Sequence, residues 1–308
     1  MARGDDVIAL ARHALDGNRD MVVTACRCII ANEPNNSSLK ERMQKVLLRM
    51  PTSMPFQDLV PEALKGLVVP TVPEMGIDDV ELPKEVVSDL KSFLEEQSFL
   101  AEIHSSGLNV PHKILMSGPP GNGKTVLAGA IAKELDLPLF VVDFSSVVSN
   151  LLGGTGAKIA KLFRGATEKP CVLFLDEMET VLCERGQGSN EVGEMKRIVS
   201  TILLEIDRLP DHVILIGATN HEELLDRAVV RRFDLLWSLP KPTDDQVQEW
   251  LHRFARHYPD IPILNEMPPI KADGRSFSDI SREVKKWCRR WIVEQASSPQ
   301  PQVAIGRN

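Results

Sequence analysis

The hydrophobic pattern divides the chain into an α/β region flanked by two helical regions. Four short apolar runs have the length expected of strands buried on both faces, and they cover residues 113–117, 138–143, 171–175 and 213–220. A helical pattern follows the first run at 126–135. Strands that alternate with helices in this way predict a parallel sheet covered by helices.

Residues outside this region have a different pattern. Three amphipathic helical patterns occupy residues 1–50, and Ser38 followed by Glu41 fits a capping box at the start of the third. Five prolines in 51–75 favour a linker. We therefore predict a helical recognition module at residues 1–50, followed by a proline-rich linker at 51–75. An α/β core at 76–240, a helical lid at 241–295 and a flexible tail at 296–308 complete the prediction.

Residues 118–125 carry the phosphate-binding pattern G-x-x-x-x-G-K-[ST] between the first predicted strand and its helix. Glycines let backbone N–H groups wrap phosphates, and the helix N-terminus adds partial positive charge. Lys124 would reach the β and γ phosphates, and Thr125 would bind Mg²⁺. The alternative is a glycine-rich turn that arose by chance. The predicted nucleotide-binding residues are Gly118, Pro119, Pro120, Gly121, Asn122, Gly123, Lys124, Thr125 and Val126.

The strand at 171–175 ends in two carboxylates, Asp176 and Glu177. At the carboxyl end of a parallel strand they would face the nucleotide. We expect Asp176 to hold Mg²⁺ and Glu177 to act on the attacking water as general base. The alternative is an acidic helix N-terminus, which the helix dipole favours, and Glu179 fits that description. A site that only binds nucleotide would not need Glu177.

The strand at 213–220 ends in the amide of Asn220, and the adjacent pair Arg231 and Arg232 follows. With the two motifs above, this order resembles the AAA+ ATPases, specifically the classical AAA clade. The resemblance implies that Asn220 is the sensor that orients water, and that the arginines are fingers completing a neighbouring subunit's site. The family's Pro-Gly between the arginines is absent here, so which of them acts stays open. The alternative for the pair is a solvated surface.

The resemblance covers about residues 74–295 and implies a P-loop NTPase fold of the α/β class. It implies a parallel five-stranded sheet sandwiched by helices, a C-terminal helical lid and a small N-terminal helical domain. Residues 76–80 correspond to the segment that packs on adenine, so Asp79 is an expected nucleotide contact. Ser278 lies where other clades carry a second sensor arginine, which argues that this chain lacks one, and Ser278 is itself an expected contact.

Members of this family that thread polypeptides carry an aromatic residue in a pore loop, where this chain has Leu151 and Leu152. A leucine grips by apolar contact but lacks the broad face of a ring. Threading by these leucines and simple packing of the following helix therefore remain equal alternatives.

Composition narrows the class of partner. The net charge is −7, which disfavours sequence-independent binding to nucleic acid. One cluster of four cations, at 285–290, surrounds an apolar stripe and fits a lid helix: Ile280, Val284, Trp287, Cys288 and Trp291 form the stripe.

No apolar run is long enough to span a bilayer, and no signal peptide precedes the helices, so we expect a cytoplasmic protein. The five cysteines show no metal-site spacing and are expected to be reduced thiols.

The resemblance implies an ATPase that uses ATP and Mg²⁺ and assembles with itself, as a hexamer. One functional class is a ring-shaped protein remodeller whose N-terminal helices engage a protein substrate. A second is an ATP-dependent oligomeric switch that gates a separate effector, a protease or nuclease. The small N-terminal region, the pore leucine and the compact Arg-Arg turn resemble bacterial AAA ATPases that work beside a subtilisin-like protease in anti-phage defence. A DNA-loading AAA+ machine is the third class.

Overall fold

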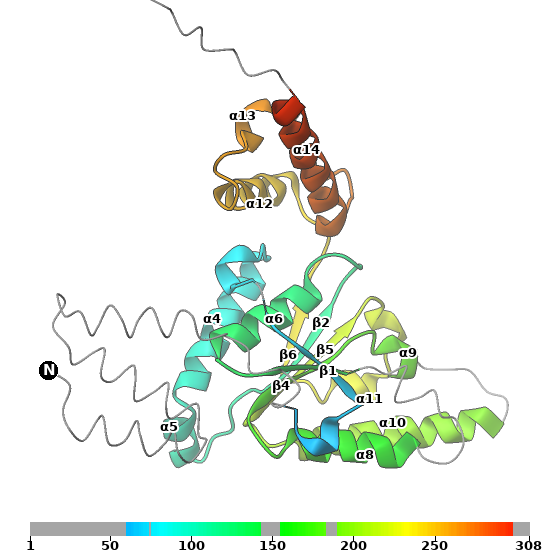
Figure 1. Cartoon of the computed structure of the whole chain (residues 1–308). Helices are drawn as coiled ribbons and strands as arrows, with labels where there is room; N and C mark the ends of the chain where they lie inside the picture. Colours follow the sequence, from blue (N-terminus) through cyan, green and yellow to red (C-terminus); the bar gives the residue numbers. More distant parts are fainter. Residues whose placement is uncertain (1–59, 74, 143–154, 183–189, 298–308) are drawn as a thin grey trace, which may run out of the picture. The chain divides into compact units, whose positions relative to one another are not determined.

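The computed structural model describes residues 60–73, 75–142, 155–182 and 190–297, all within the unit Leu59–Asn308 (Figure 1). The expected recognition module at 1–50 and the two pore leucines lie outside the described residues.

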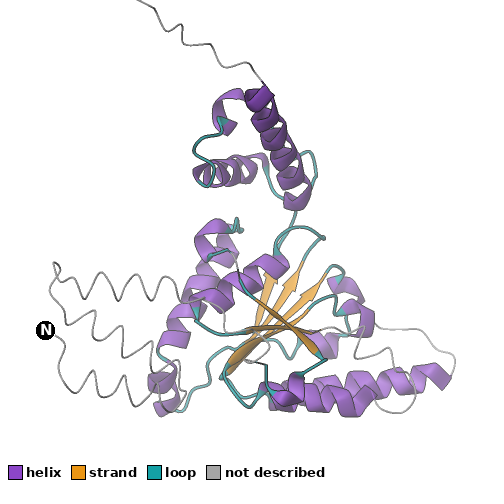
Figure 2. Ribbon diagram, in the orientation of Figure 1, coloured by secondary structure: helices purple, strands orange, loops and turns teal. Residues whose placement is uncertain are grey.

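A six-stranded sheet forms the centre of this unit (Figure 2). Its order is β1-β3-β4-β5-β2-β6. The strands are β1 (Val68–Thr71), β2 (Lys113–Ser117), β3 (Leu139–Val142), β4 (Cys171–Leu175), β5 (Val213–Thr219) and β6 (Leu235–Ser238). The five strands from β3 to β6 along this order are mutually parallel, which confirms the expected parallel sheet.

The sixth strand corrects the predicted linker. Residues 60–73 were expected to connect two domains, yet β1 pairs antiparallel with β3, with Val68 opposite Val142. The preceding short helix η2 (Glu62–Leu64) buries Leu64 completely in the core. Prolines suggested a linker, but a proline is tolerated on an edge strand, and Pro70 lies on this one.

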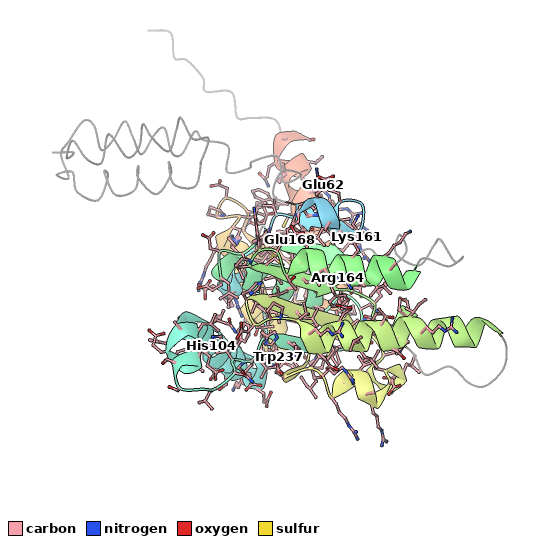
Figure 3. All side chains as sticks on the ribbon, turned by 90° about the horizontal axis from the view of Figure 1, so that it is seen from below. Glu62, His104, Lys161, Arg164, Glu168 and Trp237 are labelled. Atoms are coloured by element: carbon pink, nitrogen blue, oxygen red, sulfur yellow. The ribbon has the colours of Figure 1, made fainter. Side chains whose placement is uncertain are left out.

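Helices cover both faces of the sheet because successive strand residues point to opposite faces. Ile114 and Met116 face the cluster formed with α4 (Lys84–Ser98) and α6 (Lys124–Glu134). Leu115 faces the cluster formed with η2, α8 (Thr155–Ala166) and α10 (Asn190–Arg208). Figure 3 looks onto this second face, where α8, marked by Lys161 and Arg164, lies beside α10. The remaining short helices of the core are η3 (Ile77–Asp79), α5 (Leu100–Ser105), α9 (Glu179–Leu182), η4 (Glu222–Leu224) and α11 (Arg227–Val230).

The lid has its own small core. Helices α12 (Asp244–Arg256), α13 (Ile263–Glu266) and α14 (Phe277–Ser297) form it. The predicted apolar stripe of α14 is confirmed: Ile280, Val284 and Cys288 are buried, the two tryptophans are partly buried, and the four cations are exposed. The helix continues to Ser297, two residues into the range expected for the tail, and residues 298–308 lie outside the described residues.

Two of the cysteines lie in the described residues, and both are free and buried, as expected. Burial raises the pKa of the Cys171 thiol to about 12 and also raises that of Cys288. Such thiols are inert at neutral pH. Within the same residues, no helix is long and apolar enough to cross a membrane.

Candidate nucleotide site

Three segments with polar residues meet at one edge of the sheet. The carboxyl ends of β2, β4 and β5 lie side by side, with Ser117 opposite Thr219 and Leu175 opposite Gly217. Each strand is followed directly by a predicted site segment, namely 118–125, Asp176–Glu177 and Asn220. The parallel register therefore brings together residues that are about a hundred positions apart in the sequence.

The phosphate-binding loop requires glycine at two close approaches. Gly118 has φ 141°, and a Cβ there would lie 2.2 Å from the Leu239 carbonyl oxygen, because β6 ends beside the loop. Gly121 has φ 78°, and a Cβ there would lie 2.9 Å from Ser276 Oγ of the lid. The packing of the folded chain therefore requires glycine at these two positions, in addition to any requirement of phosphate binding.

Lys124 is held by groups of the protein itself. Its Nζ donates to the carbonyl oxygens of Gly118 at 2.5 Å and Pro119 at 3.2 Å, and to Asn220 Oδ1 at 2.8 Å. Burial lowers the pKa of this ammonium, and the carboxylates of Asp176 and Glu179 partly offset the effect. The ammonium is therefore poorly solvated and directed into the loop, where phosphate oxygens would be stronger partners than carbonyls.

Thr125 and Asp176 provide oxygen ligands of the kind Mg²⁺ prefers. Thr125 Oγ1 donates to Asp176 Oδ2 at 3.4 Å, and the other carboxylate oxygen accepts the Glu177 N–H at 2.9 Å. A hydroxyl beside an anchored carboxylate, both next to Lys124, fits a divalent cation bound to phosphate. The described residues, this site included, contain no group of three or more His, Cys, Asp or Glu side chains that could hold a metal ion by themselves.

Glu177 has a backbone conformation that is rare for its type. Its φ is 50°, in the left-handed region, and its side chain is exposed. This conformation costs a residue with a Cβ about 1–2 kcal/mol. The next residue stabilises it, because the Met178 N–H donates to the Ala218 carbonyl of β5 at 3.0 Å. Strain of this kind is common at functional sites.

Sequence reasoning missed the position of Glu179. Its Oε1 accepts the Asn220 backbone N–H at 3.2 Å and the Asn220 Nδ2 at 3.1 Å. Burial raises the pKa of Glu179, but hydrogen bonds from its own backbone, Thr219 and Asn220 outweigh burial and lower it. The carboxylate thereby turns the amide so that its oxygen meets Lys124. The only signal in the sequence was a third acidic residue after the strand.

The two arginines differ sharply in their surroundings. Asp226 caps α11 by accepting the Ala228 N–H at 2.7 Å, which sets both arginines at the end of that helix. Arg232 Nε donates to Asp207 of α10 at 3.0 Å, and its Nη1 donates to the Ala228 carbonyl at 2.6 Å. Arg231 is exposed. Arg232 is therefore bonded within its own chain, whereas the Arg231 side chain is open to solvent.

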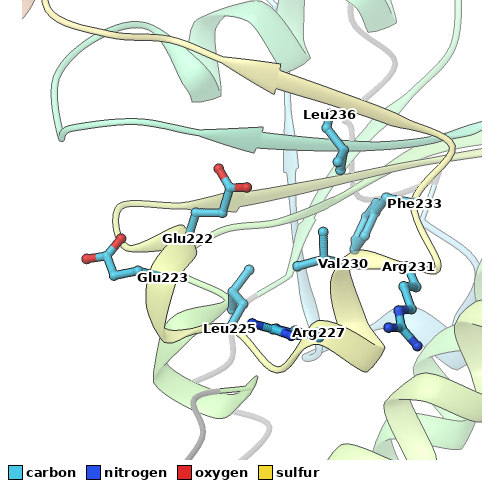
Figure 4. Close-up of a pocket in the computed structure, with 8 residues that line it drawn as sticks. All are labelled: Glu222, Glu223, Leu225, Arg227, Val230, Arg231, Phe233 and Leu236. Atoms are coloured by element: carbon cyan, nitrogen blue, oxygen red, sulfur yellow. The ribbon is translucent and has the colours of Figure 1, made fainter.

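A hollow of about 870 Å³ borders Arg231 (Figure 4). Glu222 and Glu223 of η4 lie at one side and Arg231, which follows α11, lies at the other, with Leu225 and Val230 between them. The hollow contains none of the residues at the phosphate-binding loop. It is a surface feature beside the arginines and not the nucleotide site.

The remaining predicted contacts lie where the lid meets the core. The Ser278 N–H of α14 donates to the Gly121 carbonyl at 3.0 Å, and the Phe277 N–H donates to Asn122 Oδ1 at 3.3 Å. Asp79 accepts the Gly76 N–H at 3.0 Å and faces His257, the residue that follows α12. Val126 is exposed on α6. The structure thus places Ser278 at the loop. The Asp79 carboxylate, by contrast, already has partners within the protein.

Comparison with known proteins gives the family. Residues 114–241 match the ATPase family associated with various cellular activities (AAA). An uncharacterised AAA family ATPase, y4kL, of Sinorhizobium fredii is 31% identical over 305 aligned residues, and the alignment covers 97% of this chain and 88% of that protein. This chain belongs to the AAA ATPase family.

Longer proteins share this AAA ATPase domain. The peroxisomal ATPase PEX6 of Yarrowia lipolytica is 35% identical over 243 residues, and that of Saccharomyces cerevisiae is 37% identical over 185 residues. These matches cover 73% and 58% of this chain. This chain spans only 24% and 18% of the two PEX6 proteins. Membership in the family implies ATP hydrolysis in general, with a divalent metal, by proteins that oligomerise and act on other proteins.

Proposed function

We propose that this AAA ATPase hydrolyses ATP to ADP and phosphate in a ring-shaped homo-oligomer, a hexamer, and uses the energy to remodel a protein substrate. The observation that carries the proposal is the connected set Glu179, Asn220 and Lys124 beside Asp176 and Glu177 at one sheet edge. A domain that only bound nucleotide would not need a strained, exposed carboxylate beside the phosphate site.

The chemistry follows from the positions of these groups. Lys124 binds the β and γ phosphates in place of the carbonyls it now contacts, and Asn220 orients the attacking water. Glu177 accepts a proton from that water as its oxygen attacks the γ phosphorus, and the bond to the bridging oxygen of ADP breaks. Thr125 and Asp176 would hold Mg²⁺, which would neutralise charge on the phosphate oxygens.

In the proposed ring, a neighbouring subunit completes the nucleotide site. Arg231 is exposed at the end of α11, while Arg232 is bonded to Asp207 of its own chain, so Arg231 is proposed as the finger that reaches the neighbour's nucleotide. A guanidinium there stabilises the charge of the transition state.

Replacement of Glu177 by Gln tests the proposed reaction. The variant keeps the shape of the side chain but removes the base, so kcat should fall by about 10²–10⁴-fold while ATP still binds. Phosphate release and retention of labelled ATP measure the two effects. Hydrolysis at the rate of the unchanged protein would show that Glu177 is not the base.

Mass photometry with and without ATP tests assembly, and loss of fluorescence from a folded reporter with an unstructured tail tests remodelling. ATP-dependent rings that hydrolyse ATP but never unfold the reporter would favour the oligomeric switch that gates a separate effector. Copurification of a protease or nuclease would then identify that effector.

A further inference from the structure

The segment Gly76–Glu81 lies between the core and the lid. Its short helix η3 packs against α6, the helix that begins at the phosphate-binding loop, and also against α12 of the lid. Ile77 is partly buried against the cluster that contains Leu127 and Ile131 of α6. The loop itself meets the lid through Gly121 and Ser278. A nucleotide with its phosphates in the loop would therefore extend its base along this boundary toward η3.

Arg253 of α12 binds three groups of this segment. Its Nη1 donates to the Asp78 carbonyl at 3.1 Å and to the Val80 carbonyl at 3.2 Å. Its Nη2 forms an ion pair with the Glu81 carboxylate. The guanidinium fork suits this arrangement, because its donors are fixed in one plane, whereas a lysine ammonium could not reach all three groups in the same geometry.

The ion pair is well shielded from water. The Glu81 side chain is 6% exposed and the Arg253 side chain 27%. A carboxylate this buried needs its partner, since an unpaired buried charge is strongly unfavourable. One turn further on, His257 lies 3.3 Å from Asp79, whose other oxygen closes the turn by accepting the Gly76 N–H. Helix α12 thus holds the segment at several points.

We propose that Arg253 is a positioning residue for nucleotide binding. It holds the backbone of the segment Gly76–Glu81 in the conformation that meets the base, and it links the position of the lid helix to the affinity of the site. Arg253 acts through the segment and does not touch the nucleotide. The inference rests on the proposed ATPase function, and it adds a determinant of base binding that lies in the lid.

Nucleotide binding by full-length variants tests this role. Arg253→Ala should lower the affinity for a fluorescent ADP analogue by at least about fivefold, which is the lower end of the usual coupling between sites. Arg253→Lys, which keeps the charge but not the fork, should be intermediate. Arg256→Ala removes an exposed arginine from the same helix and is the matched control, expected to bind as the unchanged protein does. Inorganic triphosphate, which has no base, should compete equally well in all four proteins.

Competition by inorganic triphosphate separates positioning from general damage, because a disrupted core would weaken the binding of triphosphate and of the ADP analogue together. Arg253→Met combined with Glu81→Gln removes the pair without leaving a buried charge, so it should fold even where Arg253→Ala does not. ADP affinity in this double variant equal to that of Arg256→Ala would overturn the proposal. Failure of the unchanged protein to bind the ADP analogue would instead overturn the proposed function itself.

Discussion

At the scale of single residues, the site depends on a chain of hydrogen bonds from Glu179 through Asn220 to Lys124. An asparagine amide can bind in two orientations that differ by exchange of oxygen and nitrogen. Glu179 accepts only from the nitrogen side, so it fixes the orientation in which the amide oxygen meets the lysine. The group proposed to orient the attacking water is thereby set before any nucleotide binds.

Loss of this carboxylate should slow hydrolysis without releasing nucleotide. We expect Glu179→Ala to lower kcat by about 10–100-fold, the usual effect of losing an outer partner of a site residue, with ADP affinity little changed. Glu179→Gln keeps an acceptor oxygen and should retain most of the activity. Steady-state phosphate release measures both, and the exposed Glu223→Ala is the control. An Ala variant as active as the control would contradict the role of Glu179.

The two arginines should give opposite phenotypes. Arg231→Ala should lower ATPase activity by about a thousandfold with no change in thermal unfolding, because the side chain is exposed and acts on a neighbour. Arg232→Ala should destabilise the fold by about 1–2 kcal/mol, because it breaks bonds to Asp207 and to the Ala228 carbonyl. Urea unfolding and ATPase assays on both variants check this. Loss of activity in Arg232→Ala alone would assign the finger to Arg232.

At the scale of elements, β5 packs against the turn that contains Glu177 and against the segment that follows α11. Gly217 in this strand leaves space for two side chains: a Cβ there would lie 2.3 Å from Met178 Sδ and 2.9 Å from Phe233 Cζ. Met178 follows Glu177, and Phe233 follows Arg232. The packing around one glycine therefore sets the distance between the proposed base and the proposed finger of the same subunit.

Gly217→Ala should disturb both groups at once. We expect a loss of stability of about 1–3 kcal/mol from overpacking, together with reduced ATPase activity. Gly156→Ala in α8 is the control: a Cβ there would have only an ordinary contact, 3.7 Å from Thr201 Oγ1, so this change should be neutral or stabilising by up to about 1 kcal/mol. Urea unfolding of both variants measures the difference. A Gly217→Ala protein as stable as the control would show that the neighbours give way freely.

At the scale of the whole molecule, activity should require contact between subunits. A site completed by Arg231 of a neighbour is incomplete in a monomer, so specific ATPase activity should fall on dilution. Mixed subunits provide the sharper experiment. Glu177→Gln subunits still supply Arg231, and Arg231→Ala subunits still supply Glu177.

Mixing these two inactive proteins should restore turnover at the interfaces where an intact Arg231 faces an intact Glu177. Phosphate release measured across mixing ratios should rise to a maximum between the pure components. Absence of rescue at every ratio, with mixed oligomers shown by mass photometry, would rule out a finger that acts between subunits. Glu177→Gln mixed with Arg232→Ala is the matching experiment for the other arginine.

The sequence by itself determined what depends on local spacing. The glycine turn at 118–123, the strands at 113–117 and 171–175, and the apolar stripe of α14 follow from periodicity and from glycine placement, and the structure has them where expected. These features are fixed by residues that are near one another in the chain, so a pattern in the sequence is enough to predict them.

Only the tertiary structure decided what depends on distant neighbours. Residues 68–71 became a strand because the edge of β3 pairs with their backbone, although the prolines of 51–75 favour a linker. Arg231 and Arg232 are adjacent in sequence, but only Arg232 meets Asp207 of α10. Glu179 gained its position because β4 and β5 pair in parallel, which places Asn220 within reach of its carboxylate. Each outcome depends on which partner the fold brings close, and that information is absent from local spacing.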